Sequence, residues 1–221
     1  MSNQLHGKKF EDLLKGCGLF SGAADSKRSP ISGFDIEEKF DRLLGIPTSI
    51  KATGTNTVSL SDARKFWSIN HPFRMLIGVY VQDGVHKKFV RVEEILVHGC
   101  MFAGLRGNIS AAAVAELHEG IGLAAFDHGE EEEARDWFRE VHAKVLHNLG
   151  LVRLNPKIDS KGQRRLQCSV PLDSLVALAK KMPDFVGQSG QPAPTYRCHA
   201  EEIGDLGLPI TLKSGRRVFN P

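Results

Sequence analysis

The sequence lacks any apolar run near the ~20 residues that a membrane-spanning helix needs, so it predicts no transmembrane segment. Residues 1–7 also lack the apolar stretch of a secretory signal peptide. Cysteine is scarce, and the four cysteines, Cys17, Cys100, Cys168 and Cys198, are spaced too widely to suggest a disulfide framework in a chain of this size. These absences lead us to expect a protein of the reducing cytoplasm.

Hydrophobic residues make up 41% of the 221 residues, which is enough for one domain with a packed core. Charge is distributed unevenly along the chain. Residues 151–221 contain 11 Lys and Arg against 6 Asp and Glu, a balance of +5, whereas residues 1–150 contain 18 against 20, a balance of −2. A basic carboxyl-terminal third favours an anionic partner such as nucleic acid.

Helices and strands alternate in the first half of the predicted secondary structure. Apolar periodicity predicts helices over residues 6–16, 59–69, 110–119, 130–148 and 171–181. Runs of β-forming residues predict strands over residues 34–37, 47–51, 73–82 and 86–96. Ser59 or Ser61 is the expected N-cap of the second helix, and Asp83-Gly84 is a strong hairpin signal. This order predicts an α/β fold with a central mixed β-sheet flanked by helices, followed by a mostly helical carboxyl-terminal elaboration.

Asp35 and Lys51 are the residues on which a functional interpretation depends. Side chains alternate across a strand, so Asp35 and Glu37 share one face of their strand, and Ser49 and Lys51 share one face of the next. If the two strands pair in a suitable register, carboxylates and an ammonium group converge on one patch. Acids that hold a hard cation, with a lysine beside the attacking water, are the chemistry of Mg²⁺-dependent phosphodiester hydrolysis.

The order of elements over residues 6–97 and the stretch SIKATGTNTVSLSDA at residues 49–63 resemble the PD-(D/E)XK nuclease superfamily, and type II restriction endonucleases in particular. The resemblance implies a single nuclease domain, with a restriction-endonuclease-like core over about residues 6–105 and a DNA-recognition elaboration over about residues 106–221. It implies a Mg²⁺-dependent, sequence-specific endonuclease that hydrolyses phosphodiester bonds of double-stranded DNA. A homodimer on a palindromic target and a cognate DNA methyltransferase are implied as well.

The resemblance also assigns roles to residues of the site. Asp35, the Ile50 carbonyl and a second acid would hold Mg²⁺, and Lys51 would orient the nucleophilic water. The sequence departs from the family pattern at Ser49, because an acid is expected two residues before the lysine and a hydroxyl is a poor Mg²⁺ ligand. The candidates for the missing acid are Glu37 and, on the opening helix, Glu11. Without either, the chain would be an inactive relative.

Residues 153–167 are the predicted DNA-recognition segment, with five cations against one acid. Arg can pair with guanine and Asn or Gln with adenine, whereas Lys more often holds phosphates. The stretches PKI and QRRLQ resemble some restriction enzymes. The predicted DNA-binding residues are Asn155, Lys157, Lys161, Gln163, Arg164, Arg165 and Gln167, with Arg64 and Lys65 on the second helix and further phosphate contacts from Lys213, Arg216 and Arg217. A basic hairpin without function is the alternative.

Two other functions fit the same residues. One is a structure-specific DNA repair or junction-resolving nuclease of the same fold, although recognition residues far from the core favour the restriction enzyme. The other is a DNA-binding protein without catalysis, which Ser49 suggests because it replaces a metal-binding acid.

Overall fold

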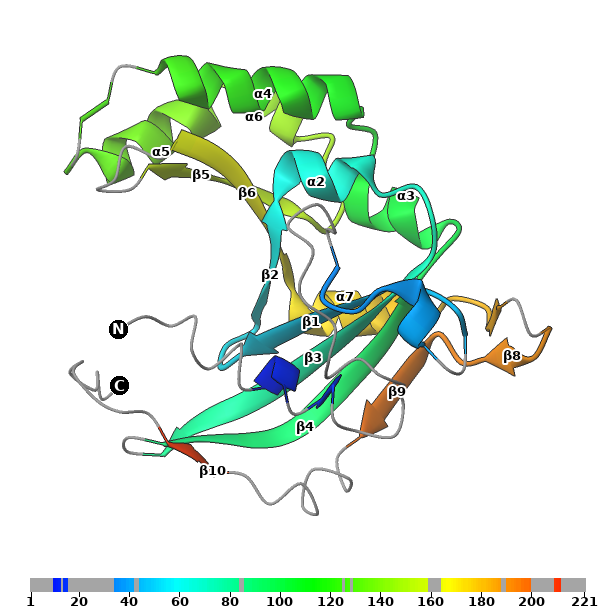
Figure 1. Ribbon diagram of the computed structural model, residues 1–221. Coiled ribbons are helices and arrows are strands. Elements are labelled where there is room, and N and C mark those ends of the chain that lie inside the picture. The colour runs from blue at the N-terminus through cyan, green and yellow to red at the C-terminus, as the bar shows by residue number, and fades with distance from the viewer. Residues whose placement is uncertain are drawn as a thin grey trace. The chain divides into compact units, whose positions relative to one another are not determined.

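A computed structural model shows the chain as two units that alternate along the sequence (Figure 1). The structure describes residues 10–12, 14–15, 34–41, 44–83, 86–124, 126–127, 129–158, 164–187, 190–199 and 209–211. The first unit comprises Met1–Asn56, Pro72–His98 and Ala179–Pro221, and the second comprises Thr57–His71 and Gly99–Leu178. This grouping differs from a core and an elaboration that meet near residue 105, because the chain enters the second unit twice.

The first unit contains a mixed central sheet with the strand order β1-β3-β4, and β9 and β10 both pair with β4. Its strands are β1 (Thr48–Thr53), β3 (Phe73–Asp83), β4 (His86–Val97), β9 (Tyr196–His199) and β10 (Pro209–Thr211), and a separate ribbon is formed by β7 (Phe185–Val186) and β8 (Pro192–Ala193). β1 runs parallel to β3, whereas β4 is antiparallel to β3, β9 and β10. The predicted α/β class with a mixed central sheet is therefore confirmed, as are the strands predicted at 47–51, 73–82 and 86–96.

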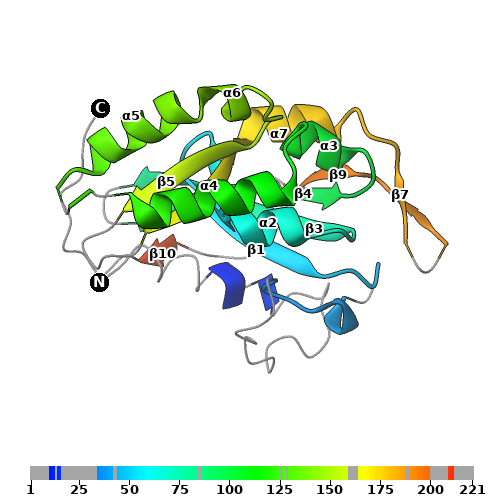
Figure 2. The same cartoon turned by 90° about the horizontal axis from the view of Figure 1, so that it is seen from above.

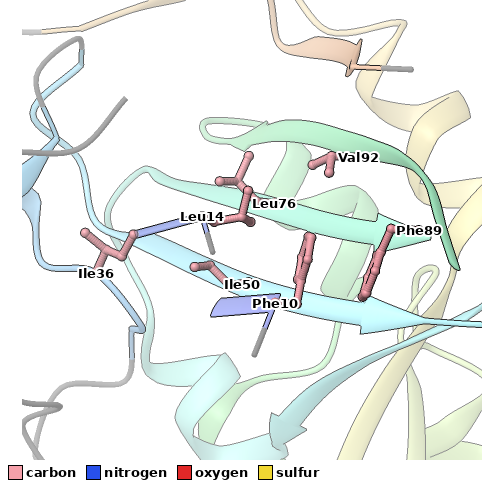
Figure 3. Close-up of a cluster of buried hydrophobic side chains, with 7 residues drawn as sticks. All are labelled: Phe10, Leu14, Ile36, Ile50, Leu76, Phe89 and Val92. Carbon is pink, nitrogen blue, oxygen red and sulfur yellow. The ribbon is translucent and has the colours of Figure 1, made fainter. Parts of the chain in front are cut away.

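One face of this sheet packs against helical residues near the amino terminus (Figure 3). The buried cluster consists of Phe10, Leu14, Ile36, Ile50, Leu76, Phe89 and Val92. Phe10 stacks on Phe89 with ring centroids 4.4 Å apart. Gly78 makes this approach possible, since a Cβ there would lie 2.4 Å from the Phe10 ring. Because Ile36 and Ile50 belong to the cluster, hydrophobic packing fixes the neighbours of Asp35 and Lys51.

The second unit contains an antiparallel sheet with the order β2-β6-β5 (Figure 1) and, among its described residues, six helices, which Figure 2 shows from above. Its strands are β2 (Thr57–Asp62), β5 (Arg153–Ile158) and β6 (Arg164–Pro171). Its helices are α2 (Ala63–Ser68), α3 (Met101–Arg106), α4 (Ala111–Leu123), α5 (Glu131–Val141), α6 (Ala143–Leu146) and α7 (Leu172–Ala179). α4 packs against β6 and α5 against β5. The helices predicted at 110–119, 130–148 and 171–181 correspond to α4, to α5 with α6, and to α7.

Residues 34–37 do not form the predicted strand. Ile36 makes only an isolated antiparallel bridge with Thr48, and the short 3-10 helix η2 (Glu38–Phe40) begins directly after Glu37. Glu and Lys are poor strand formers, so the run that follows Ile36 does not extend the pairing. Asp35 and Glu37 therefore do not share the face of a strand.

The second predicted helix begins later than the sequence pattern suggests. Ser59 and Ser61 lie in β2, and the N-cap of α2 is Asp62, whose Oδ1 accepts a 3.2 Å hydrogen bond from the Lys65 amide. Residues 57–60 alternate exposed and buried side chains, which is the period of a strand. Ser61 has φ 78° at an irregularity in the pairing of β2 with β6, and this marks the end of regular strand geometry.

Candidate active site

Asp35 lies beside the edge strand β1, one residue before the bridge between Ile36 and Thr48. Its amide donates to the Thr48 carbonyl at 3.0 Å, which holds the backbone against the strand. The residue is buried, and its Oδ2 accepts a 2.6 Å hydrogen bond from the Ile50 amide and a 3.4 Å hydrogen bond from the Ser49 hydroxyl. Both donors suit a negatively charged carboxylate in a defined orientation.

Lys51 meets Asp35 at this edge. The Lys51 Nζ lies 3.8 Å from the Asp35 Oδ2, and the Lys51 side chain is 21% exposed while that of Asp35 is 6% exposed. The predicted convergence of the two side chains therefore occurs, although no long strand pairing brings it about. A single bridge and the hydrogen bond to the Ile50 amide place the carboxylate beside the lysine.

The Ile50 carbonyl lies on the same side of β1 as Asp35. The amide and carbonyl of one strand residue point to the same neighbour, and the Ile50 amide points to Asp35. A carboxylate, a backbone carbonyl and an ammonium group therefore line one edge of the sheet. Carboxylate and carbonyl oxygens are the ligands that hard cations prefer.

The two candidates for a second acid take part in other ion pairs. The Glu37 carboxylate is 2.8 Å from the Lys39 Nζ, and its side chain is 39% exposed. The Glu11 carboxylate is buried and pairs with the Lys15 Nζ at 2.7 Å, one helical turn along. Within the described ranges, no group of three or more His, Cys, Asp and Glu side chains could hold a metal ion. Asp35 is the acid that the described contacts place beside Lys51.

A buried charge network anchors the segment that leads from Asp35 to β1. Arg74 on β3 is 1% exposed, and its guanidinium contacts the carboxylates of Asp41 and Glu94 at 3.1 Å each. His199 on β9 contacts Glu94 at 2.8 Å. Because Asp41 belongs to the segment between Asp35 and β1, we infer that these contacts position Asp35 relative to the sheet. Sequence reasoning missed this network, and its one signal was an arginine inside an apolar strand.

The predicted DNA-recognition segment forms the antiparallel hairpin β5–β6 of the second unit. Asn155 lies opposite Gln167, and Lys157 lies opposite Arg165. Asn155 and Lys157 are exposed, and Arg165 and Gln167 are half-buried. The register therefore brings four of the predicted DNA-binding side chains together on one face.

Arg164 does not belong to that group. It lies opposite Ile158 in the register, and its Nη2 donates to the backbone carbonyl of Phe126. Alternation along β6 directs neighbouring side chains to opposite faces, so Arg164 and Arg165 have different surroundings. Arg164 fixes the chain between α4 and α5, whereas Arg165 lies among the exposed polar residues of the hairpin.

The remaining predicted DNA-binding residues are less informative. Arg64 and Lys65 are exposed on α2. Lys161 and Gln163 lie outside the described residues, as do the tail cations Lys213, Arg216 and Arg217.

No family model, curated protein or solved structure matches this chain. Across the part of the chain that the structure describes, no helix is long and apolar enough to cross a membrane. Among the described residues, Cys100, Cys168 and Cys198 form no disulfide. Because the comparisons found no match, the interpretation of the site depends on the geometry of this chain's own residues.

Proposed function

We propose that the protein is a Mg²⁺-dependent, sequence-specific endonuclease that hydrolyses phosphodiester bonds of double-stranded DNA, as type II restriction enzymes do. The observation that carries the proposal is the contact between Asp35 and Lys51 at the edge of β1, with the Ile50 carbonyl on the same side. The same proposal includes a homodimer, because a palindromic target favours a two-fold symmetric enzyme. It also includes a cognate DNA methyltransferase and a location in the cytoplasm.

The residues of the site fit Mg²⁺ held by one protein carboxylate. Mg²⁺ usually keeps several waters and binds through one or two carboxylates together with substrate phosphates. Asp35 would supply a carboxylate oxygen and Ile50 its carbonyl oxygen, and water and phosphate oxygens would complete the shell. Mg²⁺ bound there would polarise the phosphoryl group and acidify a water molecule.

Lys51 has the freedom that its role requires. Its Nζ is 3.8 Å from the Asp35 Oδ2, a longer separation than the ~2.7–2.9 Å of a tight charge-assisted hydrogen bond. The ammonium group is therefore able to turn toward a phosphate, orient the attacking water and stabilise the charge that develops on the phosphoryl oxygens. In-line attack breaks the bond from phosphorus to the 3′ oxygen, which leaves a 5′ phosphate.

Asp35 is held in place before substrate binds. The Ile50 amide fixes its Oδ2 at 2.6 Å, so the carboxylate needs little reorganisation to act as a ligand. Preorganised charges of this kind lower a reaction barrier because their orientation is set by folding.

Replacement of Asp35 or Lys51 tests the proposal directly. We expect Asp35→Ala and Lys51→Ala to lower single-turnover cleavage of unmethylated linear duplex DNA by ~10²-fold or more, because each removes a charged group from the reacting site. Both variants should stay folded by circular dichroism and should still bind DNA. The unmodified protein should give discrete fragments with Mg²⁺ and none with EDTA.

Glu37→Gln and Glu11→Gln decide which acid, if either, completes the site. The variant that loses cleavage without losing thermal stability identifies the missing acid. Full activity in Asp35→Ala or Lys51→Ala would refute the site assignment.

A DNA-binding protein without catalysis is the second candidate function. It is favoured by the Ser49 hydroxyl, which contacts Asp35 where a second carboxylate is expected. DNA binding that persists in EDTA, with no cleavage in Mg²⁺ or Mn²⁺, would support this function. Cleavage of branched DNA alone would instead support a structure-specific nuclease.

A further inference from the structure

We propose that the exposed face of the hairpin β5–β6 enters the major groove of DNA and reads it with two cross-strand rows of different chemistry. The amide row is Asn155 opposite Gln167, and the cation row is Lys157 opposite Arg165. The inference rests on the proposed function, because it assigns how the same protein selects its substrate.

The two faces of this hairpin differ in burial and polarity. Along β5 the side chains of Leu154 and Pro156 are buried, whereas those of Asn155 and Lys157 between and after them are exposed. Leu166 on β6 is also buried, and α4 and α5 pack against these two strands. The apolar face therefore belongs to the core of the second unit, and the opposite face presents the two rows.

The cation row has no evident benefit for the fold. Residues directly opposite each other in an antiparallel pair have Cβ atoms ~4.5–5.5 Å apart, and like charges at that distance destabilise the pair. Lys157 and Arg165 are such a pair. An anionic or acceptor-rich ligand on the exposed face, such as a guanine edge or a phosphate, would relieve this repulsion.

The orientation of the Asn155 side chain is determined by its neighbours. Its Nδ2 donates to the Ser169 Oγ at 2.9 Å and to the Arg153 carbonyl at 3.3 Å. A carbonyl only accepts, so the nitrogen of the amide is identified. Among the described residues no donor contacts the Asn155 oxygen, so this oxygen is able to accept a hydrogen bond from a base. Gln167 in the same row offers a donor and an acceptor. Together they match the amino group and N7 of adenine, which lie in the major groove.

The distance between the two rows predicts the distance between the base pairs that they contact. Two residues along a strand span ~6.6–6.8 Å, which is about two base-pair steps of ~3.4 Å. A two-stranded ribbon fits the major groove of B-DNA, which is ~12 Å wide, but not the deep and narrow major groove of an RNA duplex. We therefore expect the preferred site to contain an A·T pair read by the amide row and a G·C pair about two steps away read by the cation row.

The test measures DNA binding apart from cleavage. Full-length protein carrying Lys51→Ala binds a pool of randomised duplex DNA, and the selected sequence is compared with single base-pair changes by fluorescence anisotropy. Adding Gln167→Ala should lower discrimination at the A·T position by about 5- to 150-fold, and adding Arg165→Ala should do the same at the G·C position. Arg164→Ala is the matched control, since it removes the same charge one residue away but from the other face. Thermal melting shows that each variant is folded.

The inference is supported if each row variant relaxes its own position and Arg164→Ala relaxes neither. It is overturned if Gln167→Ala and Arg165→Ala keep the original preference, if Arg164→Ala relaxes it equally, or if duplex DNA binds no better than duplex RNA or an acidic polypeptide. Cleavage by the unmodified protein remains a separate readout. If the unmodified protein cuts DNA but Gln167→Ala and Arg165→Ala keep the original sequence preference, this inference alone is refuted. If the two variants lose that preference but the unmodified protein cuts no DNA, the proposed nuclease alone is refuted.

Discussion

At the scale of single residues, Ser49 has the largest effect on what the site can do. Its side chain is buried, and its hydroxyl contacts the Asp35 Oδ2 at 3.4 Å. A second carboxylate there would face the first one with no cation between them, and like charges at such a distance disfavour ionisation. Serine therefore avoids this repulsion in the metal-free protein, and under the proposed function it would leave Mg²⁺ with fewer protein ligands.

Ser49→Asp tests how a second carboxylate at this position changes thermal stability and Mg²⁺ affinity. We expect the variant to melt at a lower temperature without Mg²⁺ and to be stabilised more by added Mg²⁺ than the unmodified protein, because a second carboxylate adds a ligand and binding to the folded state raises stability. Thermal melting across a Mg²⁺ titration measures both effects. Ser49→Asn is the control of similar size without charge. If Mg²⁺ stabilises the Asp variant no more than the Asn variant, this edge of β1 is not a cation site.

At the scale of elements, the transition from β2 to α2 shows how a local signal is misassigned. Two serines and one aspartate compete as the N-cap, and all three are favourable cap residues. The outcome depends on pairing with β6, which keeps Ser59 and Ser61 in the strand and leaves Asp62, the last residue of β2, as the N-cap of α2.

The cap assignment leads to a stability prediction. Asp62→Ala should lower the free energy of unfolding by ~1 kcal/mol, because the Lys65 amide loses its acceptor. Ser59→Ala, at the cap position that the sequence alone suggests, should change it much less. Urea denaturation of both variants measures the difference. Equal losses in the two variants would contradict the assignment of the cap.

At the scale of the whole molecule, half-buried histidines connect stability with pH in both units. Burial lowers the pKa of His98, His118 and His142 below the ordinary value of 6.5. For His118, nearby Arg64 lowers the pKa further. Its Nδ1 also accepts a 3.3 Å hydrogen bond from the Leu166 amide, and a protonated ring could not accept that bond.

The sign of the pH dependence follows from these lowered pKa values. As pH falls through 6.5, the unfolded chain takes up protons on these histidines before the folded protein does, so the free energy of unfolding should fall. Thermal melting between pH 7.5 and pH 5.5 measures the effect. His118→Gln should make the dependence shallower, while His147→Gln, which changes an exposed side chain, serves as the control. A melting temperature that rises as the solution becomes more acidic would contradict the prediction.

The sequence by itself determined the elements whose signals are local. The apolar runs of β3 and β4, separated by Asp83-Gly84, form a hairpin because turn and strands are adjacent in the chain. The periodic stretches of α4 and α5 form helices for the same reason, since helical contacts join residues three and four apart. Asp35 and Lys51 could also be selected in advance, because their residue types are those that the proposed chemistry requires.

Only the tertiary structure decided what depends on residues far apart in the chain. The single bridge at Ile36 brings Asp35 to Lys51, and the Arg74 ion pairs hold that segment on the sheet. The register of β5 with β6 separates Arg164 from Arg165 although they are neighbours in sequence. A change of one residue in register would reverse which side chains face solvent, and no local pattern carries that information.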